Sequence, residues 1–207
     1  MKALIINGSG ILFGGRSGIR SVLKSLGMEK EMLVQKREYN NNKDKGPWGL
    51  DQLASLFKGI NEKEVNEKCE EFVDENLDSD SIDIIRKIKQ KGFLIVSYSS
   101  DLNIISNILM KKFGLDGVLG NELEFENGIA TGKILKMVDR YDRAEKIKDL
   151  INSNNLTREN VLIIGDSVTA LPSLKLGRVI AFRSENQELN KKAEFRINNI
   201  NELLNIV

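Results

Sequence analysis

The sequence predicts an α/β fold with a parallel sheet, and three short apolar runs are the main observations behind this prediction. Residues 3–6, 93–96 and 161–164 each have the length of a strand and end directly in small or polar residues. Continuous apolar runs of this length are typical of strands that are buried on both faces. Helical patterns lie between the runs, and alternating strands and helices favour a parallel sheet with right-handed crossovers.

The segment after the first run differs, because only helical patterns occur between residues 14 and 80. These patterns cover residues 19–26, 50–57 and 62–75, and the stretch 40–45 between them is polar. We therefore expect a helical insertion that lies over the sheet. Trp48, the single tryptophan, is expected to pack in the small core of this insertion.

The rest of the chain returns to alternating elements. Helical patterns at residues 81–90, 102–113 and 143–153 accompany the second and third runs, and a weaker fourth strand is expected at residues 179–182. Residues 119–129 contain Asn127 followed by Gly128 in an alternating segment. This pair is typical of tight hairpin turns, so the sequence also predicts a β-hairpin.

Composition limits the chemistry that is open to the chain. Its 31 Lys and Arg residues nearly balance its 30 Asp and Glu residues, so charge gives no reason to expect nucleic acid or an anionic membrane as a partner. The sequence contains no histidine, which excludes Ser-His-Asp catalysis, Cys-His catalysis and histidine metal sites. With one cysteine, Cys69, and no apolar run of about 18 residues, we expect a cytoplasmic protein.

Three strand ends in this order, with a helical insertion directly after the first, resemble the haloacid dehalogenase superfamily and its phosphoserine-phosphatase-like branch. The stretch 165–172, GDSVTALP, is similar to the glycine-aspartate motif of that family. The resemblance implies a Rossmann-like three-layer core formed by residues 1–13 and 81–207, with a small all-helical cap at residues 14–80. It also implies the activity of a phosphatase that depends on magnesium.

In that family an aspartate nucleophile ends the first strand, and a second aspartate two residues later protonates the leaving group. Here Asn7 and Ser9 hold these places. A neutral amide is a far weaker nucleophile than a carboxylate. A serine in place of the acid/base carboxyl group is expected to cost about 10²–10⁴-fold in rate. The resemblance therefore assigns Asn7 and Ser9 as degenerate catalytic positions.

The other motifs of the family keep groups that suit an anion better than a metal. Ser97 matches the hydroxyl that binds the phosphoryl group, and Arg143 matches the family's lysine. Asp166 matches a magnesium ligand, whereas Ala170 stands where a further acidic residue is expected. Because magnesium prefers several oxygen ligands that include carboxylates, we expect at most a weak metal site at Asp166 and no cofactor.

These assignments lead to the hypothesis of a small anionic ligand that is bound but not turned over. Asp166 and Arg143 carry opposite charges, so a phosphate-like or carboxylate group could approach without a metal. Arginine also offers a bidentate fork for an oxyanion. The expected phosphate-binding residues are Gly8, Gly10, Ser97 and Arg143, the glycines through their backbone amides.

Two other functions stay open at this point. One is a magnesium-dependent phosphomonoesterase that uses unusual residues. The other is a dinucleotide-binding protein, because Gly8, Gly10 and Gly14 give a spacing close to the Rossmann fingerprint. That fingerprint needs an acidic residue about 20 residues further on, and the acidic residues in that region, Glu29 and Glu31, lie in helical sequence.

Each site residue also has a purely structural interpretation. Gly8 and Gly10 could form a tight turn without a ligand. Ser97 or Asp166 could cap a helix, and Arg143 could be a solvated residue on a helix surface. The arrangement of these side chains in space separates the two interpretations.

Overall fold

A computed structural model describes residues 1–42, 49–139 and 142–207, and in it the described strands form one seven-stranded sheet. The strand order is β4-β3-β2-β1-β5-β6-β7, and every neighbouring pair is parallel except β3 and β4. The strands are β1 (Lys2–Asn7), β2 (Phe93–Leu102), β3 (Gly117–Glu126), β4 (Ile129–Lys136), β5 (Val161–Gly165), β6 (Arg178–Phe182) and β7 (Phe195–Ile197). The predicted α/β fold with a parallel sheet is confirmed.

The three predicted apolar runs form the centre of this sheet. β1 pairs with β2 on one side and with β5 on the other. Its residues 3–6 are at most 1% exposed, as expected for a strand that is covered on both faces. The fourth predicted strand is present as β6, and the short strand β7 was not predicted.

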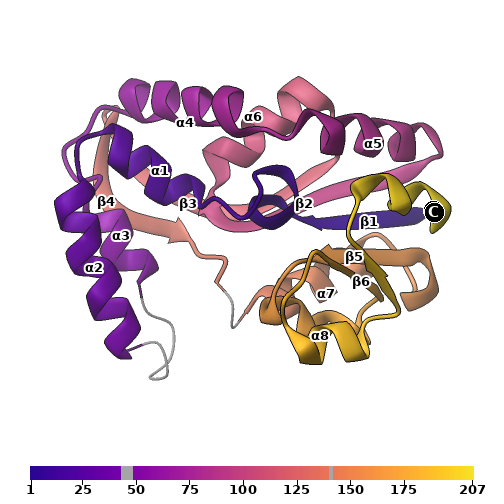
Figure 1. Ribbon diagram of the computed structural model, residues 1–207. Coiled ribbons are helices and arrows are strands. Elements are labelled where there is room, and N and C mark those ends of the chain that lie inside the picture. Colours follow the sequence, from indigo (N-terminus) through magenta and orange to yellow (C-terminus); the bar gives the residue numbers. More distant parts are fainter. Residues whose placement is uncertain (43–48, 140–141) are drawn as a thin grey trace.

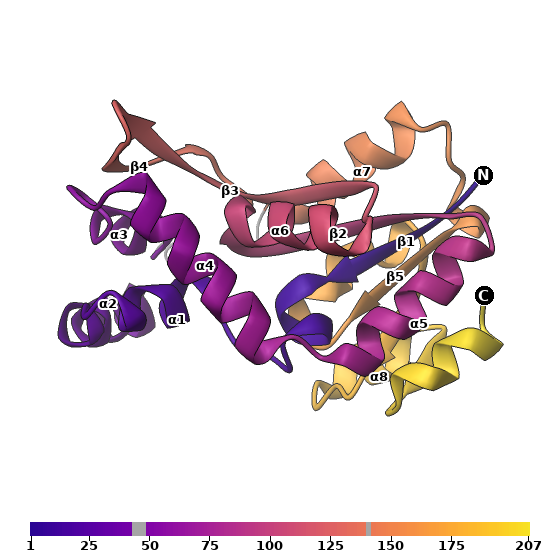
Figure 2. The ribbon, with the colours of Figure 1, turned by 90° about the horizontal axis from the view of Figure 1, so that it is seen from above.

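Helices cover both faces of the sheet and complete a three-layer core (Figure 1, Figure 2). Leu4 and Ile6 belong to an apolar cluster shared with α5 (Ser79–Gln90) and α6 (Asn103–Phe113). Ala3 and Ile5 belong to a second cluster, shared with α7 (Arg143–Ser153) and α8 (Gln187–Lys192). Alternate side chains of a strand point to opposite faces, so the two clusters identify the two faces of the sheet.

The segment after β1 is helical, as predicted, with one additional helix. Its helices are α1 (Gly18–Ser25), α2 (Glu29–Asn42), α3 (Leu50–Ser55) and α4 (Glu62–Asn76). Helix α2 includes residues 40–42 of the polar stretch, and its first turn carries Glu29 and Glu31, which interact favourably with a helix N-terminus. Figure 1 shows α1, α2 and α3 beyond the carboxyl end of β1. Trp48 lies outside the described residues.

Four further helical segments, which are not α-helical, complete the described elements. They are η1 (Gly8–Leu12), η2 (Arg158–Asn160), η3 (Val168–Lys175) and η4 (Ile200–Asn205). Two of them, η1 and η3, begin at or shortly after the carboxyl ends of β1 and β5. They therefore carry side chains toward the edge of the sheet where the functional residues were predicted.

The predicted hairpin is formed by β3 and β4. Asn127 and Gly128 both have positive φ angles, of 52° and 77°, as a tight primed turn between two strands requires. The hairpin also contacts the helical segment, because Ala130 donates to the backbone of Ile60 at 2.9 Å and accepts from Gly59 at 2.9 Å. It thereby ties the sheet to the residues between α3 and α4.

The described helices include none that is both long and apolar enough to cross a lipid bilayer.

Candidate functional site

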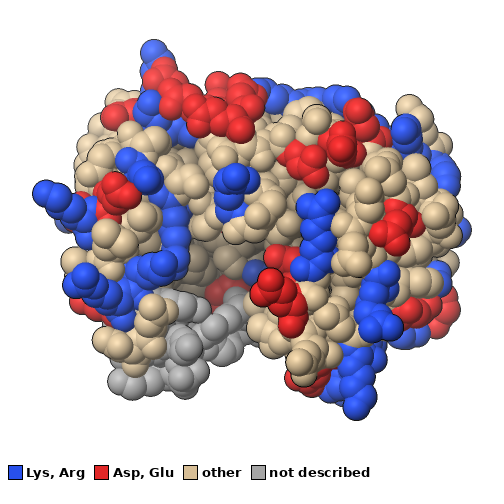
Figure 3. Space-filling view, in the orientation of Figure 1, with Lys and Arg blue, Asp and Glu red and all other residues tan. Residues whose placement is uncertain are grey.

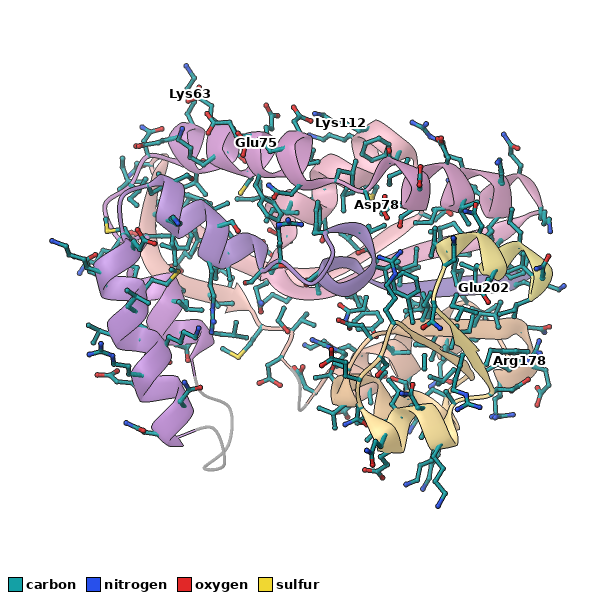
Figure 4. All side chains as sticks on the ribbon, in the orientation of Figure 1. Lys63, Glu75, Asp78, Lys112, Arg178 and Glu202 are labelled. Carbon is teal, nitrogen blue, oxygen red and sulfur yellow. The ribbon has the colours of Figure 1, made fainter. Side chains whose placement is uncertain are left out.

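The carboxyl ends of β1, β2 and β5 meet at one edge of the sheet. Asn7 pairs with Tyr98 of β2, and Ile6 pairs with Ile164 of β5. Figure 3 shows a hollow in this part of the surface, between the side that carries α2 and the side that carries α7 and α8. Charged residues at the other end of the molecule, such as Arg178 and Glu202 in Figure 4, lie away from it. We take the strand ends as the candidate site.

Asn7 and Asp166 face each other across the ends of β1 and β5. Asn7 Nδ2 donates to Asp166 Oδ1 at 2.7 Å, and Asn7 is 8% exposed. The turn η1 closes over this pair so tightly that a Cβ atom at Gly10 would overlap the carboxyl group of Asp166. An amide in this position stabilises the carboxylate, whereas a second carboxylate would repel it.

Arg143 is a buried cation whose side-chain partners are neutral. It is 6% exposed, and it donates to Thr169 Oγ1 at 2.8 Å and to Ser100 Oγ at 2.7 Å. Its Nε–H has no partner in the described part of the chain, and the ion pairs found there do not include it. A buried charge without a counterion is costly unless something binds to it, so this guanidinium favours an anion.

Tyr98 forms the platform on which Arg143 lies. The guanidinium carbon of Arg143 is 5.0 Å from the centroid of the Tyr98 ring, which is within the range of a cation–π contact. Tyr98 is fully buried, and burial raises the pKa of its hydroxyl to about 12. The ring therefore stays neutral at physiological pH and cannot serve as the counterion of Arg143.

Ser97 is not brought together with Arg143. It is fully buried, and its hydroxyl has no hydrogen-bond partner among the described residues. A Cβ atom at Gly8 would lie 2.8 Å from Ser97 Oγ, so this hydroxyl sits directly beneath the backbone of η1. Because Ser97 and Tyr98 are adjacent on β2, their side chains leave the strand on opposite faces, and Arg143 lies on the Tyr98 face.

Sequence reasoning missed Asp101, a buried carboxylate that contacts Ser9. Asp101 is 3% exposed. Its Oδ2 accepts from Ser9 Oγ at 3.0 Å and from Ser99 Oγ at 3.2 Å, and Ser9 and Ser99 are themselves 2.8 Å apart. Its Oδ1 accepts from Ser17 Oγ at 3.2 Å and from the backbone of Ile19 at 3.0 Å. The available signal was a carboxylate that follows an apolar strand among three serines, since such a group must find donors.

The predicted Ser9 position therefore belongs to a network of hydroxyl groups and one carboxylate. Three contacts link these residues: Ser9 with Ser99, Ser9 with Asp101, and Ser99 with Asp101. Only two hydroxyl protons, one from each serine, are available for them. At least one of them is directed to the carboxylate. Ser9 is partly exposed while Asp101 is buried, so Ser9 is the part of the network that a ligand could reach.

The donor set of the site does not fit a tightly held magnesium ion. In residues 1–42, 49–139 and 142–207, no group of three or more His, Cys, Asp or Glu side chains is placed to hold a metal. One oxygen of Asp166 accepts from Asn7, and Ala170 is 1% exposed beside Gly165. Magnesium needs several oxygen ligands in octahedral geometry, and these residues offer only Asp166 as a charged one.

The dinucleotide interpretation lacks its acidic residue. Glu29 and Glu31 lie in the first turn of α2 and not at the end of a second strand. The segment that follows β1 consists of helices, whereas the dinucleotide fingerprint needs a strand–helix–strand unit. Gly8 and Gly10 are instead required by the close approach of η1 to Ser97 and Asp166.

Comparisons with known proteins agree with this architecture. Residues 15–175 match the family model described as haloacid dehalogenase-like hydrolase. The chain is 28% identical over 138 residues to a phosphoserine phosphatase of Archaeoglobus fulgidus, a match that covers 66% of the chain and 39% of that protein. It is 26% identical over 160 residues to one of Idiomarina loihiensis, covering 76% of the chain and 70% of that protein.

Solved structures show the same fold. A phosphoserine phosphatase in apo form superimposes with a TM-score of 0.80 at 20% identity, over 100% of this chain and 98% of that one. A phosphoserine phosphohydrolase-like protein from Francisella tularensis gives a TM-score of 0.66 at 16% identity, over 100% of both chains. The predicted three-layer fold and its resemblance to phosphoserine phosphatases are thus confirmed, and the chain spans about two fifths of the Archaeoglobus relative.

Proposed function

Because the chain belongs to the haloacid dehalogenase-like hydrolase family, we propose that it binds a phosphate-like or carboxylate anion at the strand ends and hydrolyses phosphomonoesters very weakly or not at all. Relatives named phosphoserine phosphatase support an anion of this class. The proposal separates binding from turnover, and different residues support its two halves.

The observation that carries the binding half is the environment of Arg143. A guanidinium has five N–H donors, and two of them donate to the hydroxyl groups of Ser100 and Thr169. Those hydroxyl groups accept from the cation, so their own protons are directed elsewhere. The proton of Ser100 can donate to a ligand, and that of Thr169 can do so when Ser167 Oγ, 3.0 Å away, donates to Thr169. An oxyanion beside Arg143 would meet a cation and two polarised hydroxyl groups.

This geometry changes the set of residues that we expect to bind the anion. Ser97 was predicted as a phosphate-binding residue, but its burial beneath Gly8 supports a packing role. Ser100 and Thr169 take its place in the proposal. The backbone amides of Gly8 and Gly10 stay in this set because η1 brings them to the same edge of the sheet.

The loss of turnover is supported by the first-strand residues. Asn7 is engaged with Asp166 and presents an amide where phosphoryl transfer to the protein would need a charged carboxylate. Ser9 offers a hydroxyl group that contacts Ser99 Oγ at 2.8 Å and the Asp101 carboxylate at 3.0 Å, and it stands where the family pattern calls for a carboxyl group. Both substitutions act on the same chemical step, so the expected loss of rate is large.

The binding half is tested with inorganic phosphate as the probe. We expect isothermal titration to detect phosphate binding in the presence of EDTA, and we expect Arg143→Met to weaken it by about tenfold or more, which corresponds to about 1.4 kcal/mol. The matched control is Arg178→Met, which removes an arginine paired with Glu194 at 2.8 Å at the other end of β6 and should leave the affinity unchanged. Crystals soaked in phosphate and magnesium that show ordered magnesium and no anion would contradict the proposal.

One observation favours a second function, a slow magnesium-dependent phosphomonoesterase. The carboxylate of Asp101 lies 3.0 Å from Ser9 Oγ, so an acidic group stands next to the position that resembles the family's acid/base. Assays with p-nitrophenyl phosphate and phosphoserine decide between the two functions. Turnover that needs magnesium and is lost in Asp166→Ala would favour the phosphomonoesterase.

We also propose a cytoplasmic location and a small anionic ligand as the partner. A lone cysteine, Cys69, supports a reducing compartment such as the cytoplasm. The near balance of 31 basic and 30 acidic residues supports a small anionic ligand over nucleic acid.

A further inference from the structure

Asn121 is a buried amide whose two ends hold two different segments of the chain. It lies on β3 and is 0% exposed. Its Nδ2 donates to the backbone oxygen of Ser100 at 2.6 Å, and its Oδ1 accepts from the backbone N–H of Val138 at 2.7 Å. Loss of this side chain would leave two backbone groups without a partner, which is the costly way to break a hydrogen bond.

The first of these segments is a bulge in β2. Between Tyr98 and Leu102 the pairing of β2 with β3 shifts, because β2 has extra residues there. A bulge leaves backbone groups unpaired in the ladder and redirects side chains. Asn121 supplies a donor to the carbonyl of Ser100 inside this bulge, and the hydroxyl group of Ser100 accepts from Arg143 at 2.7 Å.

The second segment leads from β4 into α7. The backbone N–H of Val138 donates to Asn121 Oδ1. Beyond it, the backbone N–H of Asp139 donates to the Asp142 carboxylate at 3.0 Å, and that of Asp142 donates to the Asp139 carboxylate at 3.1 Å. Arg143 follows directly as the first residue of α7. The side chain of Asn121 therefore fixes both the acceptor of the Arg143 guanidinium and the segment that carries the backbone of Arg143.

We propose that Asn121 is a positioning residue, which holds the Arg143 guanidinium at the strand ends in the orientation that binds the anion. The side chain of Asn121 does not touch the ligand in this arrangement, since both its amide nitrogen and its amide oxygen are hydrogen-bonded to the backbone. The part of the inference that concerns affinity rests on the proposed anion-binding function. The part that concerns the orientation of Arg143 does not.

The affinity is tested by a double-mutant cycle with inorganic phosphate. We expect Asn121→Ala to weaken phosphate binding by about tenfold and to have no further effect when Arg143 is already methionine, because residues that act through one another are not additive. A loss that is the same in both backgrounds would overturn the inference. Asn154→Ala is the control, because it removes an amide-to-carbonyl bond of 2.8 Å at the other end of α7.

A second readout does not depend on any ligand. The buried Nε–H of Arg143 should give a protected signal in a proton–nitrogen correlation spectrum, and we expect Asn121→Ala to shift or broaden it while Asn154→Ala does not. If Asn121→Ala fails to fold, Asn121→Asp serves, because it keeps the acceptor for Val138 and loses the donor to Ser100. An unchanged Arg143 signal overturns the positioning role, whereas a changed signal without phosphate binding overturns the proposed function alone.

Discussion

At the scale of single residues, the amide of Asn7 performs a task that a bound cation performs in sites built from facing carboxylates. Its N–H group lies 2.7 Å from an oxygen of Asp166 and offsets that negative charge within the chain. A hydrogen bond to a charged group contributes about 1.5–3 kcal/mol, and the Asp166 carboxylate that accepts this one is half-buried. The pair is consequently stable without a metal, and its stability depends on position 7 being an amide.

Asn7→Asp should therefore lower the thermal stability in EDTA, because two carboxylates would then face each other at hydrogen-bond distance. We expect a loss of about 2 kcal/mol, and we expect part of it to be restored by magnesium, which would have gained a second carboxylate ligand. Thermal unfolding with and without magnesium measures both effects. Asn154→Asp, with the same change of charge near the end of α7, should show no magnesium dependence, and a similar response in the two variants would refute the explanation.

Tyr98 gives a prediction for the dependence of stability on pH. Burial raises the pKa of its hydroxyl to about 12, while an unfolded chain has the ordinary value of about 10. As the pH rises from about 10 to 12, the unfolded state loses its proton first, so the free energy of unfolding should fall across this interval and be unaffected below it. Urea unfolding at pH 9 to 12 measures this decrease. The free energy of unfolding of Tyr98→Phe should decrease less steeply over the same interval.

At the scale of elements, the start of α1 depends on one carboxylate from β2. Asp101 accepts from Ser17 and from the backbone of Ile19 on one oxygen, and from Ser9 and Ser99 on the other. Ser17 caps α1 by position but makes no capping bond of its own. Asp101 thus supplies the acceptor for the first turn of α1 from another part of the fold, and it joins the helical segment to the end of the sheet.

Asp101→Ala should destabilise the protein by about 3 kcal/mol, because it removes a buried acceptor and leaves its donors without partners. Amide hydrogen exchange at Ile19 should increase more than exchange in α5. The reference is Asn61→Ala at the start of α4, where the side chain accepts from Lys63 at 2.9 Å and a cap is typically worth about 1 kcal/mol. Equal losses in the two variants would show that Asp101 is no more than a helix cap.

Elements were easier to predict than the contacts between them, for a physical reason. A strand such as β1 is determined by a continuous apolar run, and the turn of the hairpin by Asn127 and Gly128, so both can be read locally. The bulge in β2 has no such local signal, because it depends on pairing with β3. From the sequence, Ser97 is predicted to share the anion site with Arg143, and only the bulge shows that the hydroxyl in contact with Arg143 is that of Ser100.

At the scale of the whole molecule, the sheet order explains why distant parts of the sequence meet at one site. The two strands that contain Asn7 and Tyr98, and the strand that precedes Asp166, are neighbours in the order β2-β1-β5, and parallel strands deliver their carboxyl ends to the same edge. The apolar runs and the alternation of elements predicted this convergence. They could not predict Asp101, whose partners include residues 82 and 92 positions away in the chain.

The bond between Asn7 and Asp166 also has a consequence for how this chain could change over time. A lineage that acquired an acidic residue at position 7 alone would first place two like charges in contact. It would fold less well until a divalent ion became available to separate them, and the alanine at position 170 would still deprive that ion of a further ligand. A change of Asn7 to an acidic residue would therefore begin with a disadvantage, and the present pair acts as a barrier to it.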